Sequence, residues 1–369
     1  MIALDMPCGP AMVERIARAW DSGDAVFPLD QRAPNAHKSM LLDIVQPTRV
    51  CTTTDEVVRP GLPAEPGDAA IILTSGTTGS PKAVVLSKDS LSAGARRTHA
   101  RLDVGTTDAW LCCLPPWHVG GFGVIARSVL TGTRVIAVEG FDPASYRQAA
   151  LEGATFVSLV STAMARVDPS LYRTILLGGS RPPEIRPPNC VTTYGMTETG
   201  GGVVYDGLPL DDVEVLIRDG VIHLRAPMLM TRYIGAPAPV DSSGWYRTND
   251  LGHVDEHGRL HVEGRIDDVI ITGGEKVWPE TVERCIDAHP SVKESCVVGS
   301  EDPEWGQSVT AWIVTQGGDE PSLESIRDHV KDSLPPHCAP KRIAFIDSLP
   351  RTSLGKIERV RMRSRPLPD

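Results

Sequence analysis

Apolar residues in the first two thirds of the chain occur in short runs that are separated by longer amphipathic stretches. The runs predict buried strands over residues 69–74, 82–86, 109–114, 133–138 and 155–160. The stretches predict helices after Ser87, near residues 122–130 and from Pro143, and Ser87 is a residue type that caps helices. Strands that alternate with helices in this way are typical of an α/β sheet with helices on its faces.

A different pattern begins near residue 205. Alternating apolar positions over residues 213–218 and 221–225 flank Asp219-Gly220, which predicts a β-hairpin because Asp-Gly suits a tight turn with positive φ. After a strand at 259–263, the chain from about residue 266 predicts a compact α+β segment. Its elements are helices 279–288 and 323–333 and strands 292–299, 308–315 and 342–346. We therefore expect a large α/β domain over residues 1–266, ending in a β-rich subdomain, and a small α+β domain over residues 267–369.

The composition excludes several classes of protein. With 41% hydrophobic and 23% charged residues among 369, neither a disordered chain nor a coiled coil is expected. The charges sum to 37 − 47 = −10, which argues against a general nucleic-acid binder. No run approaches the roughly 20 apolar residues of a membrane span, and the N-terminus lacks the pattern of a secretory signal. Eight scattered cysteines without a C-x-x-C pair indicate reduced thiols, so we expect a cytoplasmic enzyme.

The most informative segment is LTSGTTGSPK, residues 73–82, between two predicted strands. Its hydroxyl groups and backbone N–H groups can surround phosphate oxygens, and Lys82 adds positive charge. It is not a Walker loop, because the spacing G-x-x-x-x-G-K-[ST] is absent. The candidate phosphate-binding residues are Thr74, Ser75, Gly76, Thr77, Thr78, Gly79 and Lys82.

Two further segments carry candidate nucleotide chemistry. Glu198 lies in a turn rich in Thr and Gly, residues 193–202, and a carboxylate there could hold Mg²⁺ on ATP phosphates. Asp250 could accept both hydroxyls of a ribose, with Arg265 nearby. Taken singly, Asp250 and Arg265 would more often form a surface ion pair.

A competing motif, G-x-G-x-x-A, begins at Gly121. Pro115-Pro116 ends the preceding strand early, so the tight strand–turn–helix unit of a dinucleotide site is not expected. The histidines predict no metal site, although His118 could line a pocket.

The chain resembles the adenylate-forming superfamily of acyl-CoA and aryl-CoA ligases, carrier-protein adenylation domains and luciferases. Six segments carry the resemblance in the family's order: TSGTTGSPK (74–82), YGMTET (194–199), YRTND (246–250), GRIDD (264–268), TGGEKV (272–277) and PRTSLGK (350–356). Ala83 and Asn249 depart from the glycines that are usual in the family. The N-terminal part is also over a hundred residues shorter than in typical members.

The resemblance implies a reaction with ATP, Mg²⁺ and coenzyme A, in which a carboxylic acid becomes an acyl-adenylate and then a thioester. It implies catalytic roles for Lys356, Glu198 and Thr78, with Glu198 near the metal, and a hinge at Asp267 about which a mobile C-terminal domain turns. It implies that Tyr194 and the Gly178-Gly179 loop flank adenine, and that Asp250 and Arg265 bind the ribose. The remaining implied positions are Gly195, Met196 and Thr197 beside the nucleotide and Gly273, Gly274, Glu275 and Lys276 on the coenzyme A side.

Within the superfamily, the segments on the substrate side are most similar to the compact o-succinylbenzoate–CoA ligases of menaquinone biosynthesis seen in actinobacteria. This resemblance implies an acid pocket formed by His118, Gly120, Gly121, Gly200 and Gly201. Arg127 and Ser128 are candidates to bind the second carboxylate of the acid, and a purely structural arginine is the alternative. Another aryl or acyl acid, a carrier-protein acceptor in place of coenzyme A, and a homodimer are left open.

Overall fold

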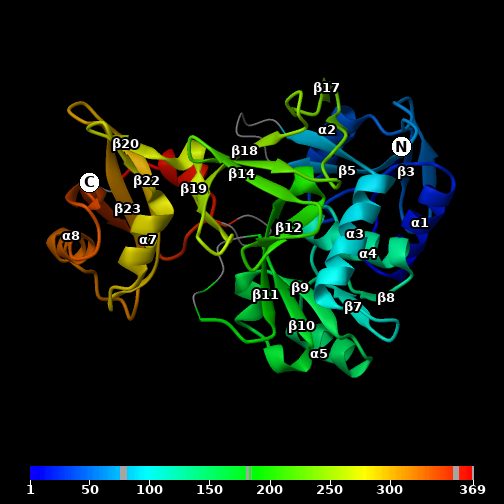
Figure 1. Ribbon diagram of the computed structural model, residues 1–369, viewed down its shortest axis with the longest axis horizontal. Helices are drawn as coiled ribbons and strands as arrows, with labels where there is room; N and C mark the ends of the chain where they lie inside the picture. Colours follow the sequence, from blue (N-terminus) through cyan, green and yellow to red (C-terminus); the bar gives the residue numbers. More distant parts are fainter. Residues whose placement is uncertain (75–80, 180–182, 184, 352–356, 368–369) are drawn as a thin grey trace. The chain divides into compact units, whose positions relative to one another are not determined.

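The computed structural model describes residues 1–74, 81–179, 183, 185–351 and 357–367 (Figure 1). Contacts between residues divide the chain into two compact units. The N-terminal unit comprises Met1–Val215 and Leu224–Tyr246, and the C-terminal unit comprises Leu216–His223 and Arg247–Asp369. The predicted domain boundary at residues 266 and 267 thus lies inside the C-terminal unit, because residues 247–265 share their contacts with that unit. A functional boundary at this point stays a prediction.

The first sheet of the N-terminal unit has eight strands in the order β17-β16-β6-β5-β2-β1-β3-β4. They are β1 (Ile2–Leu4), β2 (Val26–Pro28), β3 (Arg49–Cys51), β4 (Glu56–Val58), β5 (Asp68–Thr74), β6 (Lys82–Ser87), β16 (Arg232–Tyr233) and β17 (Ala236–Pro237). Helices α1 (Pro10–Asp21) and α2 (Asn35–Val45) connect the first strands. The predicted strands at 69–74 and 82–86 are confirmed as β5 and β6, which pair antiparallel.

The second sheet of this unit has seven strands in the order β13-β12-β11-β10-β9-β7-β8. They are β7 (Ala109–Cys112), β8 (Arg134–Ala137), β9 (Phe156–Leu159), β10 (Thr174–Leu177), β11 (Cys190–Met196), β12 (Gly201–Tyr205) and β13 (Leu208–Pro209). Strands β8, β7, β9, β10 and β11 run parallel, and β12 returns antiparallel to β11. The sheet therefore has the α/β character that the sequence predicts.

Helices separate the strands of the second sheet. They are α3 (Lys88–Leu102), α4 (Val119–Thr131), α5 (Pro143–Leu151), α6 (Ser161–Met164) and the 3₁₀ turns η1 (Pro169–Leu171) and η2 (Thr197–Thr199). The Ser87 hydroxyl accepts a hydrogen bond from the Ser90 N–H at 3.0 Å, which confirms Ser87 as the N-cap of α3. Trp110, Phe122 and Phe156 are fully buried between the helices and the sheet.

A four-stranded sheet has the order β14-β15-β18-β19, with β14 (Glu214–Arg218), β15 (Val221–Arg225), β18 (Tyr246–Val254) and β19 (Leu260–Arg265). Between β14 and β15, Asp219 has φ 52° and Gly220 has φ 77°. Both central residues of the turn therefore have positive φ, as a two-residue hairpin requires. The predicted hairpin is confirmed.

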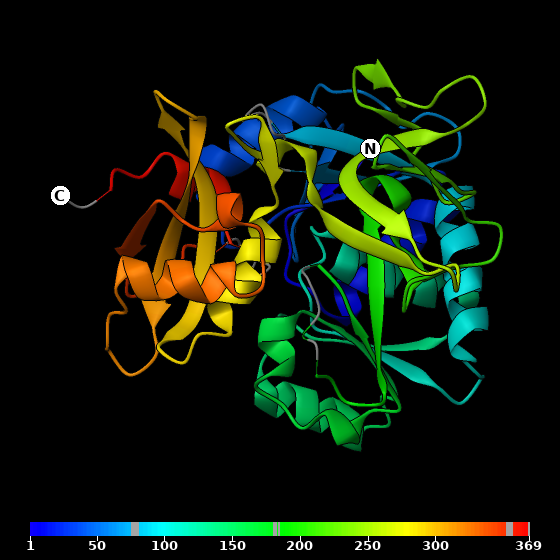
Figure 2. The same cartoon turned by 60° about the vertical axis from the view of Figure 1, so that its left-hand side comes forward.

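The rest of the C-terminal unit is an α+β body. Its elements are η3 (Ile266–Asp268), β20 (Ile270–Thr272), β21 (Glu275–Val277), α7 (Pro279–Asp287), β22 (Val292–Asp302), β23 (Gly306–Thr315), α8 (Leu323–Lys331), η4 (Pro336–Cys338), β24 (Arg342–Phe345) and α9 (Arg359–Arg363). Helices α7 and α8 cover one face of the sheet, as Figure 2 shows. The predicted α+β segment is confirmed, and β22 is three residues longer than expected.

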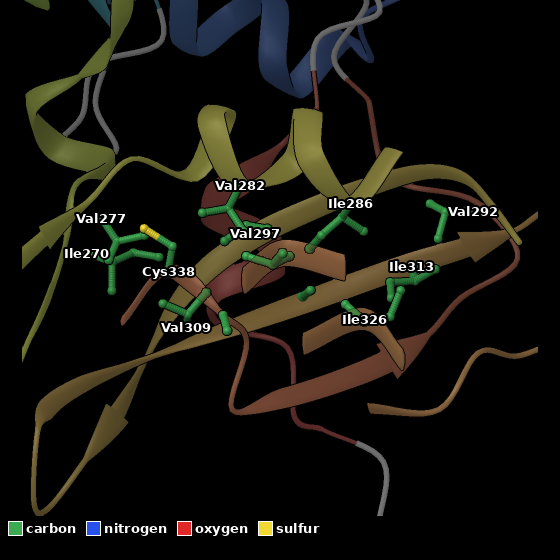
Figure 3. Packing of buried hydrophobic residues seen from close by; sticks show 13 residues of the cluster. Ile270, Val277, Val282, Ile286, Val292, Val297, Val309, Ile313, Ile326 and Cys338 are labelled. Carbon is green, nitrogen blue, oxygen red and sulfur yellow. The ribbon is translucent and has the colours of Figure 1, made fainter. Parts of the chain in front are cut away.

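Alternation along β22 divides the apolar side chains between two clusters. Val297 faces the cluster beneath α7 and α8, which includes Val282, Ile286 and Ile326 (Figure 3). Cys296 and Val298 point to the opposite face and pack with Met362 of α9. This period of two is what a strand buried on both faces requires. In the part of the chain that the structure describes, no helix is long and apolar enough to cross a membrane.

Replacement of Ile286 by Ala should destabilise the C-terminal unit. Ile286 is fully buried on α7, and an Ile to Ala change at such a site costs about 2–5 kcal/mol through lost burial and the cavity that remains. Denaturant unfolding of the whole chain should show this lower free energy of unfolding in the transition of the C-terminal unit. Ile271→Ala is the matched control, because Ile271 is 54% exposed and should cost less than about 1 kcal/mol. Equal losses in both variants would contradict this packing.

Candidate active site

The predicted nucleotide residues of the N-terminal unit gather where the parallel strands of the second sheet end. Gly178 and Gly179 directly follow β10, and Tyr194 lies near the end of the neighbouring strand β11. Gly195, Met196 and Thr197 continue from Tyr194 into η2. Ligands of α/β sheets bind at the carboxyl ends of parallel strands, so this edge is the expected place for a nucleotide.

The ends of the predicted phosphate loop are held together by the first sheet. Thr74 ends β5 and Lys82 begins β6, and the two residues lie opposite each other in the antiparallel ladder. The Thr74 hydroxyl also donates to the Lys82 carbonyl at 3.5 Å. The predicted residues Ser75, Gly76, Thr77, Thr78 and Gly79 lie outside the described residues.

Glu198 is presented by a turn that is fixed through its backbone. The Thr199 hydroxyl accepts from the Met196 N–H at 2.9 Å and donates to the Gly201 carbonyl at 2.6 Å. Any residue other than glycine at Gly195 would place its Cβ 2.0 Å from the Gly201 carbonyl oxygen, so only glycine fits where β11 and β12 meet. The Met230 N–H donates to the Glu198 carbonyl at 2.7 Å from the other side. The carboxylate of Glu198 is therefore held on a rigid support.

Tyr233 links Glu198 to Lys82 and is not among the residues predicted from the sequence. Its hydroxyl donates to Glu198 Oε1 at 3.0 Å, and Lys82 Nζ lies 5.5 Å from the centre of its ring. Burial, followed by the Glu198 charge, raises the pKa of Tyr233 to about 12, so the hydroxyl keeps its proton at neutral pH. Only the pairing of β16 with β6 brings Tyr233 here, and a two-residue strand has no readable period in the sequence.

The residues around Glu198 fit a magnesium ion that is shared with a nucleotide. No Lys, Arg or His among the described residues forms an ion pair with the Glu198 carboxylate, which is half-buried. Mg²⁺ prefers hard oxygen ligands and often takes only one or two carboxylates, with phosphate oxygens and water as its other ligands. The described residues contain no group of three or more His, Cys, Asp or Glu side chains that could hold a metal by themselves. Glu198 is thus suited to a metal that arrives with the phosphates.

Arg127 lies at a small cavity next to the predicted acid-binding glycines. The cavity has a volume of about 20 Å³, which is room for about one water. It is lined by Ser90, Leu91, Gly94, Ala95 and Thr98 of α3, by Gly123, Ala126 and Arg127 of α4, and by Thr199, Gly200, Gly201, Gly202 and Met228. The structure therefore brings Arg127 together with Gly200 and Gly201. Their role in binding the acid stays a prediction.

The Arg127 guanidinium is an uncompensated charge. It stacks 4.5 Å from the ring centre of Trp110 and donates from Nη2 to the Ser158 hydroxyl at 3.5 Å. Its Nε is buried without a hydrogen-bond acceptor, and no carboxylate in the described part of the chain pairs with it. Burial lowers the pKa of Arg127, and burial together with the Arg127 charge lowers the pKa of His99 to about 4. An anion in the cavity would relieve this desolvated charge.

The other predicted acid-binding residues are arranged differently. Ser128 is buried and its hydroxyl has no partner among the described residues, but it does not line the cavity. His118 precedes α4 as its N-cap residue, and Gly120 is exposed in the first turn. Gly121 is buried against the backbone of Leu114. Of these four residues, none lines the cavity at Arg127.

Asp250 and Arg265 lie opposite each other on β18 and β19 of the C-terminal unit. Arg265 Nη1 is 3.6 Å from Asp250 Oδ1, and Arg265 Nη2 is 3.7 Å from Asp267 Oδ2. The Asn249 side chain, which stands where the family usually has glycine, donates to Asp267. Asp267 is therefore bonded to the β18–β19 side.

Asp268, the residue after the predicted hinge, is bonded to α9 rather than to β18 and β19. Asp268 Oδ1 accepts from Arg363 Nη2 of α9 at 3.2 Å, and Asp268 Oδ2 lies 3.5 Å from Arg359 Nε. Arg359 also pairs with Glu283 of α7. The Asp267 carbonyl also accepts from Arg363 Nη2 at 3.2 Å. The Asp267 carboxylate is thus bonded to the β18–β19 side, whereas its carbonyl and the Asp268 carboxylate are bonded to α9.

Lys356 lies outside the described residues, and its flanks are anchored. Arg351 and Ile357 form an antiparallel bridge, and the Glu358 N–H donates to the Pro350 carbonyl at 2.9 Å. Arg351 in turn pairs with Glu294 of β22.

The residues predicted on the coenzyme A side form the tip of the β20–β21 hairpin. Gly273 and Gly274 make its turn, and Glu275 and Lys276 follow with exposed side chains.

Comparison with known proteins shows the family to which the chain belongs. Residues 11–233 match the family described as AMP-binding enzyme, and residues 281–356 match the AMP-binding enzyme C-terminal domain. The probable 2-succinylbenzoate–CoA ligase of Mycobacterium tuberculosis is 34% identical over 97% of both chains. The 2-succinylbenzoate–CoA ligase of Bacillus cereus is 33% identical over 79% of this chain and 69% of its own length.

Solved structures show the same fold. The o-succinylbenzoate CoA synthetase of Bacillus subtilis, in complex with its acyl-adenylate intermediate, matches with a TM-score of 0.87 at 25% identity, over 100% of this chain and 89% of that one. ATP-bound MatB of Rhodopseudomonas palustris matches with a TM-score of 0.85 at 21% identity, over 98% and 88% of the two chains. The chain therefore belongs to the family of AMP-binding, adenylate-forming acyl-CoA ligases.

Proposed function

We propose that this enzyme activates o-succinylbenzoate with ATP and transfers the acyl group to coenzyme A. The observation that carries the choice of acid is Arg127, a desolvated guanidinium without a carboxylate partner among the described residues, beside Gly200 and Gly201. o-Succinylbenzoate has two carboxylates. One of them is activated, and the other needs a cationic or hydrogen-bonding partner once it is buried. The two relatives named for 2-succinylbenzoate support the same choice.

Arg127 would bind the second carboxylate, and the Ser158 hydroxyl would help to hold the guanidinium in place. The cavity holds about one water as it stands, so a ring can enter only if side chains of its wall move aside. Met228 and Leu91 are large flexible side chains in this wall, and the lining glycines offer no side chain to displace.

In the first half-reaction, the carboxylate of the acid attacks the α-phosphorus of ATP and pyrophosphate leaves. A carboxylate is already nucleophilic, so the requirement is to stabilise charge on the phosphoryl oxygens rather than to remove a proton. Thr74, Lys82 and the loop between them bind the β- and γ-phosphates, and Lys356 neutralises charge at the α-phosphate. Mg²⁺ held by Glu198 supplies further positive charge when it is bound.

In the second half-reaction, the thiol of coenzyme A attacks the acyl carbon, the thioester forms and AMP leaves. A hinge at Asp267 lets the C-terminal domain withdraw Lys356 and present the turn from Gly273 to Lys276 instead. Tyr194 with Gly178 and Gly179 binds adenine, and Asp250 with Arg265 binds the ribose, throughout both steps.

Selectivity for the acid should depend on Arg127. The kcat/KM for o-succinylbenzoate should exceed that for benzoate by about 10³-fold, since a site built for a polar group rejects analogues that lack it. In Arg127→Leu, the value for o-succinylbenzoate should fall by about 10²-fold or more while that for benzoate stays unchanged. Arg147→Leu is the matched control, because Arg147 is exposed on α5. Comparable rates with benzoate or a fatty acid in the unchanged enzyme would refute the assignment of the substrate.

The two half-reactions should separate in variants of Lys356 and Asp267. Lys356→Ala should slow pyrophosphate release by about 10²-fold or more, as the loss of one charge-stabilising donor does, and spare thioester formation from supplied acyl-adenylate. Asp267→Pro fixes φ at the hinge. It should spare pyrophosphate release and slow thioester formation. Both rates are measured for each variant in single-turnover experiments.

Equal loss of both half-reactions in Lys356→Ala would rule out its role in the first step alone. Asp267→Pro with both half-reactions intact would rule out the hinge. Thioester formed on a carrier protein but not on free coenzyme A would change the acceptor and leave the first step as proposed.

A further inference from the structure

Tyr233 stands between the two groups of the N-terminal unit that meet the phosphates and metal of ATP. Its hydroxyl donates to Glu198 Oε1 at 3.0 Å, and its ring faces Lys82 Nζ at 5.5 Å. A cation over a ring face within about 6 Å is attracted to it. One side chain therefore holds the carboxylate through its polar end and the lysine through its apolar face.

The backbone around Tyr233 is unusually well fixed for a strand of two residues. Arg232, its neighbour, makes two hydrogen bonds of 2.7 Å to the buried carboxylate of Asp68. The Thr231 N–H donates to the Val85 carbonyl at 3.0 Å, and the Ile234 N–H donates to the Ala83 carbonyl at 2.9 Å. Tyr233 cannot shift along β6 without breaking these bonds.

The same segment is tied to the turn that carries Glu198. The Met230 N–H donates to the Glu198 carbonyl at 2.7 Å, only three residues before Tyr233. Glu198 is thus held twice by one short stretch, once through its backbone and once through its carboxylate. The hydrogen bond from Tyr233 occupies one carboxylate oxygen and leaves the other for a metal.

We propose that Tyr233 is a positioning residue that orients the Glu198 carboxylate toward the metal of MgATP and holds Lys82 beside the phosphates. The proposal rests on the proposed role of Glu198 as a magnesium ligand. A group that hydrogen-bonds a metal ligand fixes its orientation, and loss of such a group costs about 10- to 100-fold in metal affinity. Tyr233 itself touches neither the metal nor the reacting atoms.

Tyr233→Phe tests the hydroxyl alone, because the ring under Lys82 remains. Calorimetric titration of the intact enzyme with ATP, at a series of Mg²⁺ concentrations and in EDTA, separates metal-dependent from metal-independent binding. The Mg²⁺ concentration that gives half of the metal-dependent gain in ATP affinity should rise by about 10-fold or more in Tyr233→Phe. The affinity for ATP in EDTA should stay unchanged.

Tyr233→Leu removes the ring as well and should weaken ATP binding in EDTA by about two- to five-fold, because Lys82 loses its support. Tyr146→Phe is the matched control. It also removes a tyrosine hydroxyl, one that donates to the Asp168 carbonyl at 3.1 Å. The ATP titrations in Mg²⁺ and in EDTA should both stay unchanged.

Glu198→Gln distinguishes a failure of the proposed magnesium ligand Glu198 from a failure of the positioning role of Tyr233. If Glu198→Gln binds MgATP as the unchanged enzyme does, Glu198 is not the metal ligand, and the proposals for Glu198 and Tyr233 both fall. If Glu198→Gln loses the metal-dependent gain while Tyr233→Phe keeps it in full, only the proposal for Tyr233 is overturned. The proposal for Tyr233 would also be overturned if Tyr233→Phe lost as much ATP affinity in EDTA as in Mg²⁺. The hydroxyl would then act on the nucleotide and not on the metal ligand.

Discussion

The buried ion pair between Arg232 and Asp68 is the interaction on which the site depends. Asp68 has 3% of its side chain exposed, and Arg232 binds both of its oxygens. A carboxylate so deeply buried must be paired, because an isolated charge in the interior is strongly unfavourable. The pair joins Arg232 of β16 to Asp68 at the start of β5, on the far side of β6 in the sheet. It therefore supports the pairing of β16 with β6, which two residues of backbone could hardly maintain alone. Through Tyr233 and Met230, this short strand then sets where Glu198 lies.

Two kinds of charged group among the described residues bear on the site. Structural charges are paired, as Arg232 is with Asp68 and Arg359 is with Glu283. Glu198 and Arg127, by contrast, have no counterion among the described residues, although one is half-buried and the other is desolvated. Charges left uncompensated in a folded chain are costly, and they are expected where a ligand completes the pair. A cation is the complement of Glu198, and an anion is the complement of Arg127.

Much of the fold could be predicted from the sequence, because long apolar runs and turn residues have clear local signals. The strands β5 and β6, the N-cap at Ser87 and the turn at Asp219-Gly220 are examples. The first 58 residues were not assigned elements. Their strands have three residues each and no visible alternation, but α1 does carry a helical signal that was missed, with Pro10 at its first position and Met12, Ile16, Ala19 and Trp20 buried on one face. Tyr233 could not be predicted, because it comes to Glu198 only through pairing between residues far apart in the sequence. The motif at 194–199 indicated Glu198, and the substrate-side segment indicated Arg127 as a candidate beside a purely structural alternative. The absence of counterions among the described residues became visible only in three dimensions.

We propose that the chain joins o-succinylbenzoate to AMP before any thiol takes part. The most direct measurement incubates the enzyme with ATP, Mg²⁺ and o-succinylbenzoate without coenzyme A and identifies the products by mass spectrometry. We expect o-succinylbenzoyl-AMP and pyrophosphate in equal amounts. When coenzyme A is added, the adenylate should be converted to the thioester and AMP while the pyrophosphate remains. Formation of ADP and phosphate, or an adenylate formed from other carboxylic acids but not from o-succinylbenzoate, would contradict the proposed function.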